Sequence, residues 1–337
     1  MLLAMKQNLI IIGAGLSGIY TAKLLEPYYT ITILEARHNA GGRIRTIDGF
    51  DMGPSWVWQH QKNILNLIEY LKLELFSQHT KGLAVYDTPK GADHFNPQAQ
   101  PPSARLKGGL GQLIQKLLTS LENSTIHYQH KVQKISYEKD GVNVKTQDKS
   151  FSATHVILAC APRIALDIEF SPKLHQHIVS QLEQTPTWMA HTAKCVITYK
   201  EPFWRRAGLS GFGFSNLGPL SEIHDSSTED KAALFGFFHS KAKVDKDHII
   251  AQLVRMFGPK AEEFLEFHLI DWRVEPFASS PLDGQALHSH PNYGYDLSDY
   301  EDHLIFTGSE SAMQEGGYLE GALIAAMATA AKLKARL

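Results

Sequence analysis

Three glycines near the start of the chain have the spacing of a loop that binds a dinucleotide. Gly13, Gly15 and Gly18 form a G-x-G-x-x-G pattern. The pattern encloses Ser17 and follows the apolar run Leu9–Ile12, which predicts a buried parallel strand. Such glycines permit a tight turn, a close approach of the backbone to a pyrophosphate and close packing of the next helix. The N-terminus of that helix would then face the phosphates.

An acidic residue follows at the distance that a ribose contact requires. Glu35 ends the apolar stretch T-I-T-I-L-E, 20 residues after Gly15. A carboxylate at this place is expected to accept hydrogen bonds from ribose hydroxyls. Strand, glycine loop, helix, second strand and acid, in this order, predict a dinucleotide site. A glycine-rich packing turn is the alternative, but it would leave Glu35 without an explanation.

A second group of glycines favours FAD over NAD. Gly41 and Gly42 precede Arg43 shortly after the ribose acid. This arrangement fits a second approach of the backbone to a long cofactor, with a guanidinium at its phosphates. A surface turn with two exposed arginines is the alternative.

A lysine close to a predicted strand is also of chemical interest. The strand-forming apolar run begins at Val196 and ends before Pro202, and Lys194 precedes it by two residues. Its ammonium is either solvated at the end of the strand or directed at a site. The strand alone leaves both interpretations open.

Composition narrows the class of protein. The 337 residues suggest two domains. A net charge of −2 argues against a general nucleic-acid binder. The two cysteines and 17 histidines show no metal-binding spacing, so we expect no metal site and a reduced, cytoplasmic setting. No apolar run reaches the roughly 18 residues that a membrane span requires.

The elements that must position these residues follow from periodicity. An amphipathic helix is expected over 62–76, and short strands with a loop over about 77–102. An alanine-rich helix that begins near 317–319 closes the chain. The second half of the chain predicts an antiparallel sheet with helices on one side. Its strand candidates are 194–200, 209–215, 232–239 and 265–273, with a helix near 246–257.

Several short motifs, at both ends and in the middle of the chain, resemble those of the flavin-containing amine oxidase family. They are G-A-G-L-S-G, L-E-A-R, G-G-R, L-K-G-G, K-C-V-I-T-Y-K-E-P-F-W, D-W and G-S-E-S-A-M-Q-E-G-G-Y-L-E-G-A. The chain looks like a short member of this family, which includes monoamine oxidases, polyamine oxidases and L-amino-acid oxidases.

The resemblance implies an α/β fold with two domains. A Rossmann-like, glutathione-reductase-like FAD-binding domain would comprise residues 1–76, 103–165 and 300–337. A second, α+β substrate domain, built on a mostly antiparallel sheet, would comprise residues 77–102 and 166–299.

The resemblance also extends the set of cofactor residues. The segment with Gly53, Ser55 and Trp56 would run along the flavin, and the backbone at Val132 would reach the adenine end. The dipole of the C-terminal helix would stabilise negative charge on the reduced flavin. Spacing and resemblance together assign these residues to FAD: Gly13, Gly15, Ser17, Gly18, Glu35, Arg37, Gly42, Arg43, Gly53, Ser55, Trp56, Val132, Gly308, Glu310, Gly317, Tyr318 and Leu319.

Three residues are expected at the chemical centre by resemblance. In the family, the lysine at the position of Lys194 hydrogen-bonds a water beside flavin N5, and an ammonium there would favour electron transfer to oxygen. Tyr318 would form one aromatic wall of a cage for the substrate nitrogen. Trp272 also matches a family position, with core packing as the alternative.

The chain departs from the family pattern in three ways. The cysteine that attaches FAD in monoamine oxidases is missing after D-W, so FAD is expected to be non-covalent. The second cage tyrosine is missing too, and simple counting puts Leu282 near its place. The chain is also shorter than typical members, mainly between Trp56 and Lys107. This predicts a more open site, or one that a partner or a large substrate completes.

The resemblance therefore predicts an FAD-dependent oxidoreductase that oxidises a C–N bond of a small amine. Oxygen would be the electron acceptor and hydrogen peroxide the product. A renalase-like oxidase of dihydronicotinamides and a flavin-binding partner subunit without turnover are the alternatives. No nucleic-acid or membrane partner is expected, and the sequence leaves the oligomeric state open.

Overall fold

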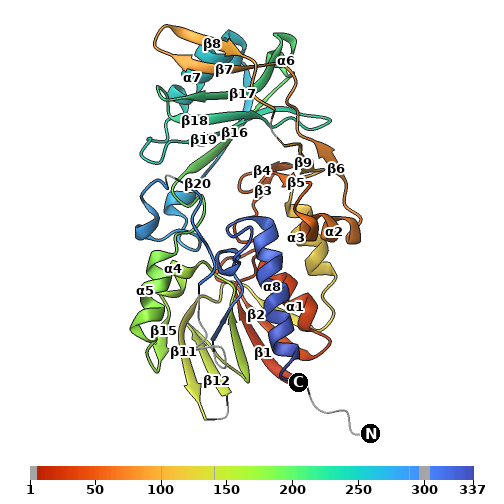
Figure 1. Cartoon of the computed structure of the whole chain (residues 1–337), viewed down its shortest axis with the longest axis vertical. Coiled ribbons are helices and arrows are strands. Elements are labelled where there is room, and N and C mark those ends of the chain that lie inside the picture. The colour runs from red at the N-terminus through yellow and green to blue at the C-terminus, as the bar shows by residue number, and fades with distance from the viewer. Residues whose placement is uncertain (1–5, 100, 140, 288, 296–303) are drawn as a thin grey trace.

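A parallel sheet of five strands carries the N-terminal glycine loop (Figure 1). The computed structural model describes residues 6–99, 101–139, 141–287, 289–295 and 304–337. The strand order is β10-β2-β1-β14-β21, and every neighbouring pair is parallel. The strands are β1 (Gln7–Ile12), β2 (Tyr29–Leu34), β10 (Ser124–His127), β14 (His155–Leu158) and β21 (Leu304–Phe306). The glycine loop after β1 and Glu35 after β2 therefore lie at the same edge of the sheet.

The parallel sheet is covered on both faces. Leu9 and Ile11 pack with helices α1, α3 and α8, whereas Ile10 and Ile12 pack with a second sheet of order β13-β12-β11-β15. Helix α8 lies along α1 (Figure 1). The elements are α1 (Leu16–Leu25), α3 (Gly111–Thr119), α8 (Leu319–Lys334), β11 (Val132–Glu138), β12 (Gly141–Thr146), β13 (Ser150–Ala153), β15 (Glu169–Ser171), α4 (Pro162–Ala165) and α5 (Gln176–Gln184). Apolar side chains on both faces of β1 explain its continuous apolar sequence.

A seven-stranded sheet forms the other end of the molecule (Figure 1). Its order is β20-β16-β19-β18-β17-β7-β8, and all neighbours are antiparallel except β17 and β7. Helix α7 covers one face, where its Leu253 shares a core with Cys195 and Ile197 of β16. The elements are β7 (Leu83–Thr88), β8 (Gly91–Phe95), β16 (Ala193–Tyr199), α6 (Phe203–Arg206), β17 (Leu209–Ser215), β18 (Leu220–Asp225), β19 (Ala232–Phe238), α7 (Lys246–Phe257) and β20 (Phe264–Asp271).

Most of the predicted elements of this region are confirmed. The candidates 194–200, 209–215, 232–239 and 265–273 correspond to β16, β17, β19 and β20, and the helix near 246–257 is α7. Strand β18 was not predicted, because only Leu220 and Ile223 of its L-S-E-I-H-D sequence are apolar. Those two side chains lie on the face of the sheet that α7 does not cover.

Two small sheets and helix α2 lie between the larger sheets. They comprise β3 (Thr46–Ile47), β4 (Phe50–Asp51), β5 (Val57–Trp58), α2 (Lys62–Tyr70), β6 (Leu75–Ser77) and β9 (Ser103–Leu106). The predicted helix over 62–76 is wrong beyond Tyr70. Lys72 adopts a left-handed conformation with φ +55°, which ends the helix. Leu75 then pairs with Leu106, so this apolar residue belongs to a strand.

Short 3₁₀ turns complete the structure. They are η1 (Pro259–Glu262), η2 (Trp272–Val274), η3 (Pro281–Asp283) and η5 (Ser309–Ser311). None of the helices in the described ranges is long and apolar enough to cross a bilayer. The predicted domain boundary at 299–300 lies outside the described residues.

Candidate active site

The first glycine loop has the geometry that its sequence predicts. Gly13 has a φ of +107°, and a Cβ at this position would lie 2.7 Å from the carbonyl oxygen of Ala159. A Cβ on Gly18 would lie 2.1 Å from the carbonyl oxygen of Gly13, so α1 packs directly on the loop. Gly15 precedes α1 and offers no side-chain cap. The N–H groups of the first helical turn are therefore available to a ligand.

The second glycine pair lies against the first loop. Gly15 and Gly41 form an isolated parallel bridge, and the N–H of Gly41 donates to the carbonyl oxygen of Ala14 at 2.8 Å. Gly42 has a φ of +61°, and a Cβ there would lie 3.2 Å from the Cα of Gly15. The two glycine loops thus lie side by side without side chains between them, and we call them the cradle. A phosphate chain can approach its backbone closely.

Glu35 links the two strands that carry the cradle. It is 4% exposed. One carboxylate oxygen accepts from the N–H of Ala14 and the other from the N–H of Arg37, each at 2.8 Å. Each oxygen keeps a further lone pair, which a ribose hydroxyl can use.

Arg43 forms a bidentate ion pair with Glu310. The two Nη–Oε distances are 2.6 and 2.9 Å, and Nη2 also donates to Ser309 Oγ at 2.9 Å. Glu310 is fully buried. Burial alone would raise the pKa of its carboxyl, but the charge and hydrogen bonds of Arg43 hold this pKa below its usual range. The pair fastens the loop before β3 to the segment after β21.

Arg37 is also engaged by an acidic residue. Its guanidinium lies 2.9 Å from a carboxylate oxygen of Glu275, and it lies over the ring of Phe277 at 5.4 Å from the centroid. The side chain therefore connects the end of β2 to the segment after β20, at one side of the cavity described next.

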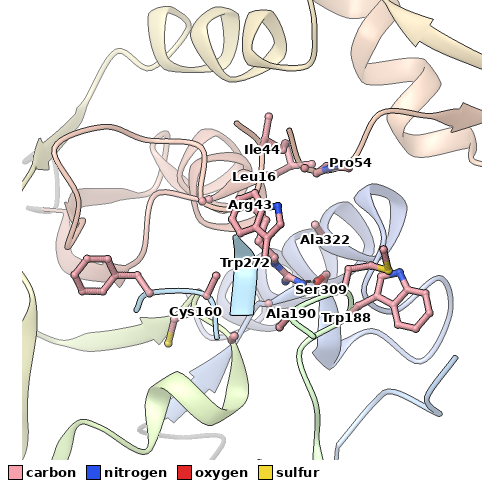
Figure 2. Close-up of a pocket in the computed structure, with 18 of the residues that line it drawn as sticks. Leu16, Arg43, Ile44, Pro54, Cys160, Trp188, Ala190, Trp272, Ser309 and Ala322 are labelled. Atoms are coloured by element: carbon pink, nitrogen blue, oxygen red, sulfur yellow. Dashed lines mark hydrogen bonds between the residues drawn. The ribbon is translucent and has the colours of Figure 1, made fainter. Parts of the chain in front are cut away.

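A cavity of about 570 Å³ runs from these loops to the N-terminus of α8. Figure 2 shows Arg43, Trp272 and Ser309 close together at its middle, with Cys160 and Trp188 on opposite sides of the view. The predicted residues that line the cavity are Gly13, Gly15, Ser17, Glu35, Arg37, Gly42, Arg43, Gly53, Ser55, Trp56, Val132, Trp272, Gly308, Gly317, Tyr318 and Leu319. Gly18, Lys194 and Glu310 do not line it. The structure therefore brings most of the predicted site together in one space.

Lys194 is buried directly behind the cavity wall. It is 0% exposed, and its Nζ donates to the carbonyl oxygen of Gly53 at 2.9 Å and to Ser55 Oγ at 2.5 Å. The ammonium also lies over the ring of Phe235, 4.1 Å from the centroid. Burial lowers the pKa of Lys194 to about 7, and the carboxylate of Asp51 opposes that effect. The ammonium is thus not solvated at a strand end, and it contacts two residues of the wall.

Two tryptophans secure the same wall. Trp272 Nε1 donates to the carbonyl oxygen of Met52 at 2.9 Å, and Trp56 Nε1 donates to Gln78 Oε1 at 3.0 Å. A Cβ on Gly53 would lie 2.0 Å from the carbonyl oxygen of Arg43, which leaves no room for a side chain. The segment from Met52 to Trp56 is therefore fixed on several sides.

The far end of the cavity is aromatic. Tyr318 lies at the N-cap of α8 and meets Trp58 edge to face at 6.1 Å and Trp188 at 6.0 Å between ring centroids. The ring of His290 stacks on Tyr318 at 5.0 Å with only 3° between the planes. Sequence reasoning missed Trp58, Trp188 and His290. The only signal for Trp188 was a tryptophan in the loop shortly before Lys194.

Leu282 does not take part in this aromatic end. It lies in η3, is 55% exposed and lines a separate cavity of about 230 Å³ with Arg163 and Asp283. Counting residues from Trp272 therefore gave the wrong position. Trp58 and Trp188, which come from other segments, provide the aromatic rings next to Tyr318.

The two ends of the cavity suit the two parts of FAD. The cradle of glycines, the uncapped helix and the carboxylate of Glu35 offer what a pyrophosphate and a ribose require. The other end offers the fixed wall at Gly53, the N-terminus of α8 and aromatic rings. The residues present therefore fit FAD, with space beside the α8 N-terminus for a small apolar or cationic molecule.

Family comparisons agree with this geometry. A profile described as flavin containing amine oxidoreductase matches residues 87–334, and one described as an NAD(P)-binding Rossmann-like domain matches residues 11–71. These matches confirm two predictions: the family resemblance that was drawn from the motifs, and the Rossmann-like domain. Membership of this family also implies a flavin cofactor.

Several curated proteins are similar to the chain. A probable flavin-containing monoamine oxidase A of Dictyostelium discoideum is 25% identical over 249 residues, which cover 69% of this chain and 54% of that protein. An L-amino acid dehydrogenase of Synechocystis is 26% identical over 67% of this chain and 50% of that protein. The chain thus spans about half the length of these two relatives. Human amine oxidase B is 21% identical, over 94% of this chain and 84% of that protein.

Solved structures share the whole fold. Wild-type putrescine oxidase bound to putrescine matches with a TM-score of 0.82 at 19% identity, over 98% of this chain and 100% of that chain. Cyclohexylamine oxidase from Brevibacterium oxydans matches with a TM-score of 0.81 at 18% identity, over 98% and 100%. These likenesses confirm the predicted α/β fold.

Proposed function

Because the chain belongs to the flavin containing amine oxidoreductase family, we propose that it uses FAD to oxidise the C–N bond of an amine to an imine. Water would hydrolyse the imine to a carbonyl compound. Oxygen would take up the two electrons and two protons and leave as hydrogen peroxide. The observation that carries this proposal is the single cavity that joins the glycine cradle to the aromatic rings at α8.

The dinucleotide end of the cavity would hold FAD. We assign Gly15 and Gly42 to the pyrophosphate, Glu35 to a ribose and the backbone at Val132 to the adenine end. When bound, the flavin ring supplies the acceptor for the hydrogen and electron pair that leave the carbon next to nitrogen. Gly317 and Leu319, at the N-terminus of α8, would favour negative charge on that ring.

Lys194 would act mainly by positioning the wall beside the flavin. Its ammonium holds Gly53 and Ser55, which line the cavity, and Trp272 holds the adjacent backbone from the other side. A hydrogen bond from Lys194 to a water beside the flavin stays a prediction. A charge just behind the wall would also favour electron transfer to oxygen, because it lies close to the developing negative charge.

Aromatic rings would orient the amine at the other end. Tyr318, Trp58 and Trp188 offer ring edges and faces to an apolar carbon chain and to its nitrogen. We propose that the neutral amine is the form that reacts, so that no side chain has to act as a base. Flavin reduction should then accelerate as the pH rises through the pKa of the substrate amine, and a flat profile would contradict this step.

We propose that FAD is bound without a covalent link, and the state of the cysteines supports this. Cys160 lines the cavity, but burial raises the pKa of its thiol to about 12, which makes it a poor nucleophile. Cys195 belongs to the core between β16 and α7 and does not line the cavity. Denaturation in acid should therefore release all of the flavin into the supernatant.

We propose that two regions of the chain form two domains with different roles. Residues 1–76, 103–165 and 300–337 would bind FAD, and residues 77–102 and 166–299 would complete the substrate end. The cavity draws its lining from both regions, since Gly15 and Tyr318 belong to the first and Trp188 and Glu222 to the second.

An anaerobic titration of the FAD-loaded protein tests the proposed function. The absorbance of oxidised flavin would be followed while monoamines, diamines, L-amino acids and dihydronicotinamides are added in turn. Reoxidation would then be measured with oxygen and, separately, with an artificial dye, because one relative is named a dehydrogenase. Lys194→Met would be compared with Lys200→Met, a control on the same segment whose side chain is exposed.

The outcomes separate the alternatives. Bleaching by an amine, slowed in Lys194→Met but not in Lys200→Met, is the expected result. Bleaching by dihydronicotinamides alone would overturn the amine assignment in favour of a renalase-like activity. If only dithionite reduced the flavin, turnover itself would be contradicted, and a flavin-binding subunit would be the remaining explanation. Reoxidation by the dye and not by oxygen would overturn the assignment of the acceptor.

A further inference from the structure

One row of side chains crosses the seven-stranded sheet from the cavity to its outer edge. Strand register places Lys194 opposite Phe237, Phe237 opposite Glu222, and Glu222 opposite Phe214. The row continues through Tyr86 of β7 to Asp93 of β8. Residues paired in this way lie on the same face of a sheet with neighbouring Cβ atoms. We call Phe237, Glu222, Phe214, Tyr86 and Asp93 the outer row.

The outer row lies on the face that α7 does not cover. The residues next to it along the strands, Val85, Ile223 and Phe238, point to the other face and share the core with α7. Phe214 is 37% exposed, and its ring lies 4.6 Å from that of Tyr86. A second aromatic ring, that of Phe95, lies 5.7 Å from Phe214. Tyr86 and Phe95 are half-buried beside exposed Phe214, and a group of aromatic rings on an uncovered sheet face is typical of a binding surface.

The inner end of the row belongs to the cavity. Phe237 and Glu222 both line it, and Lys194 is buried at the next strand. Neighbouring strands lie about 4.8 Å apart, so Glu222 stands two strands, or about 10 Å, from Lys194. Asp93 stands three strands, or about 14 Å, beyond Glu222. The row is therefore long enough for an extended molecule whose reacting end is inside the cavity.

The two acids give the row its charge. His224 Nε2 lies 2.6 Å from one oxygen of Glu222, and this hydrogen bond lowers the pKa of the carboxyl, which is therefore ionised at neutral pH. Among the residues that the structure describes, no second hydrogen bond to this carboxylate is found. Asp93 is exposed. A chain of carboxylate, two aromatic rings and carboxylate is complementary to a flexible chain that carries well-separated positive charges.

We propose that the outer row binds the distal, positively charged part of a linear polyamine while one of its nitrogens is oxidised in the cavity. This inference rests on the proposed function and names a substrate class for it. A plain alkyl monoamine would use the aromatic rings but would bring no ammonium group to Asp93 or to Glu222, which has only His224 as a partner among the described residues. The second nitrogen would pair with Glu222, and a further one would pass over Phe214 and Tyr86 to reach Asp93.

The test uses ligands that bind but have no nitrogen lone pair to oxidise. Bis-trimethylammonium alkanes of increasing length would be titrated into the FAD-loaded protein, each beside the alkyltrimethylammonium of the same length, which carries one charge. The dissociation constant would be read from the change in the flavin spectrum. At the best length, the doubly charged ligand should bind at least about tenfold tighter, as expected for a second cation that gains an ion pair with a carboxylate and a contact with an aromatic ring.

Matched variants locate the contact. Glu222→Gln should remove most of this preference, and Asp93→Asn should reduce the preference of the longest ligands by about two- to fivefold. Glu138→Gln, which removes an exposed acid from β11 in another sheet, should preserve it. The preference should also weaken as salt is added.

The failures of the two proposals are distinguishable, because this binding assay needs no turnover. Equal binding of singly and doubly charged ligands at every length would overturn the polyamine inference, even if monoamines bleach the flavin. A preference that survives Glu222→Gln would overturn the assignment to the row. If Glu222→Gln removed the preference for doubly charged ligands but Asp93→Asn had no effect on it, the proposed contact with Asp93 would be overturned. If no amine bleaches the flavin in the earlier titration, the proposed function itself fails.

Discussion

The buried ammonium of Lys194 should make the stability of the protein depend on pH in a specific direction. Its pKa falls from an ordinary value of 10.5 to about 7 in the folded protein, because burial disfavours the charge. Between these two values, the unfolded chain holds the proton that the folded protein releases. The free energy of unfolding therefore rises with pH across this window, and below pH 7 the buried charge destabilises the fold by its full amount.

The size of the effect follows from the shift. Each unit of pKa difference corresponds to about 1.4 kcal/mol. Between pH 7 and pH 10, the contribution of Lys194 should increase the free energy of unfolding by about 3 to 4 kcal/mol. For a chain of 337 residues, this is a change of about 5 °C in Tm. Lys194→Met removes the titrating group and keeps an apolar stem of similar length, so the variant should lack this rise.

The assay is the difference in Tm between wild type and Lys194→Met, measured from pH 7 to pH 10 at a constant FAD excess. The difference should move in favour of the wild type as the pH increases. Lys200→Met serves as the control, because Lys200 is exposed at the end of the same strand. Parallel pH profiles for wild type and Lys194→Met would refute the argument that this ammonium is desolvated.

Three further predictions concern the walls of the cavity. Gly42→Ala should weaken FAD binding at least about tenfold in a fluorescence titration, because the added Cβ narrows the cradle. Gly49→Ala is the control: Gly49 also has a positive φ, +87°, but its Cβ would have nothing within 4 Å. This control therefore separates the effect of backbone strain from the effect of crowding. Arg43→Met should lower the free energy of unfolding, measured in urea, by about 3 to 5 kcal/mol, because it leaves the buried carboxylate of Glu310 without its arginine. A loss under about 1 kcal/mol would contradict this. Tyr318→Leu should reduce kcat/KM for the best amine about tenfold while Tyr318→Phe retains most of it, and equal losses would show that the hydroxyl matters rather than the ring.

The nucleotide end of the site was predictable because its signals are local. The turn at Gly13, the helix contact of Gly18 and the position of Glu35 each follow from one short segment, and a parallel strand order brings them to one edge. The ion pair of Arg43 with Glu310 was only half predicted. Both residues were assigned to the site, but they are separated by 267 positions, and no local pattern indicates that one neutralises the other.

The substrate end was predictable only where a motif covered it. Tyr318 and Trp272 belong to motifs, and both line the cavity. Trp58 comes from strand β5, and Trp188 and His290 come from two loops, so their packing depends on how the sheets and helices are placed in space. The position of Leu282 was wrong because counting along the chain assumes that the segment after Trp272 keeps its length and path.

The strand that carries Lys194 shows why a lysine is buried at this position despite its cost. One face of β16 belongs to the core with α7, so the alternation of the strand turns Lys194 to the face that backs the cavity wall. There a carbonyl, a hydroxyl and the face of Phe235 surround the ammonium, and these are weaker partners than a carboxylate in direct contact. A methionine would fill the same space without desolvating a charge. Stability alone would therefore favour the methionine, and the presence of a lysine argues that the position serves the wall at Gly53 and Ser55 and the chemistry beside it.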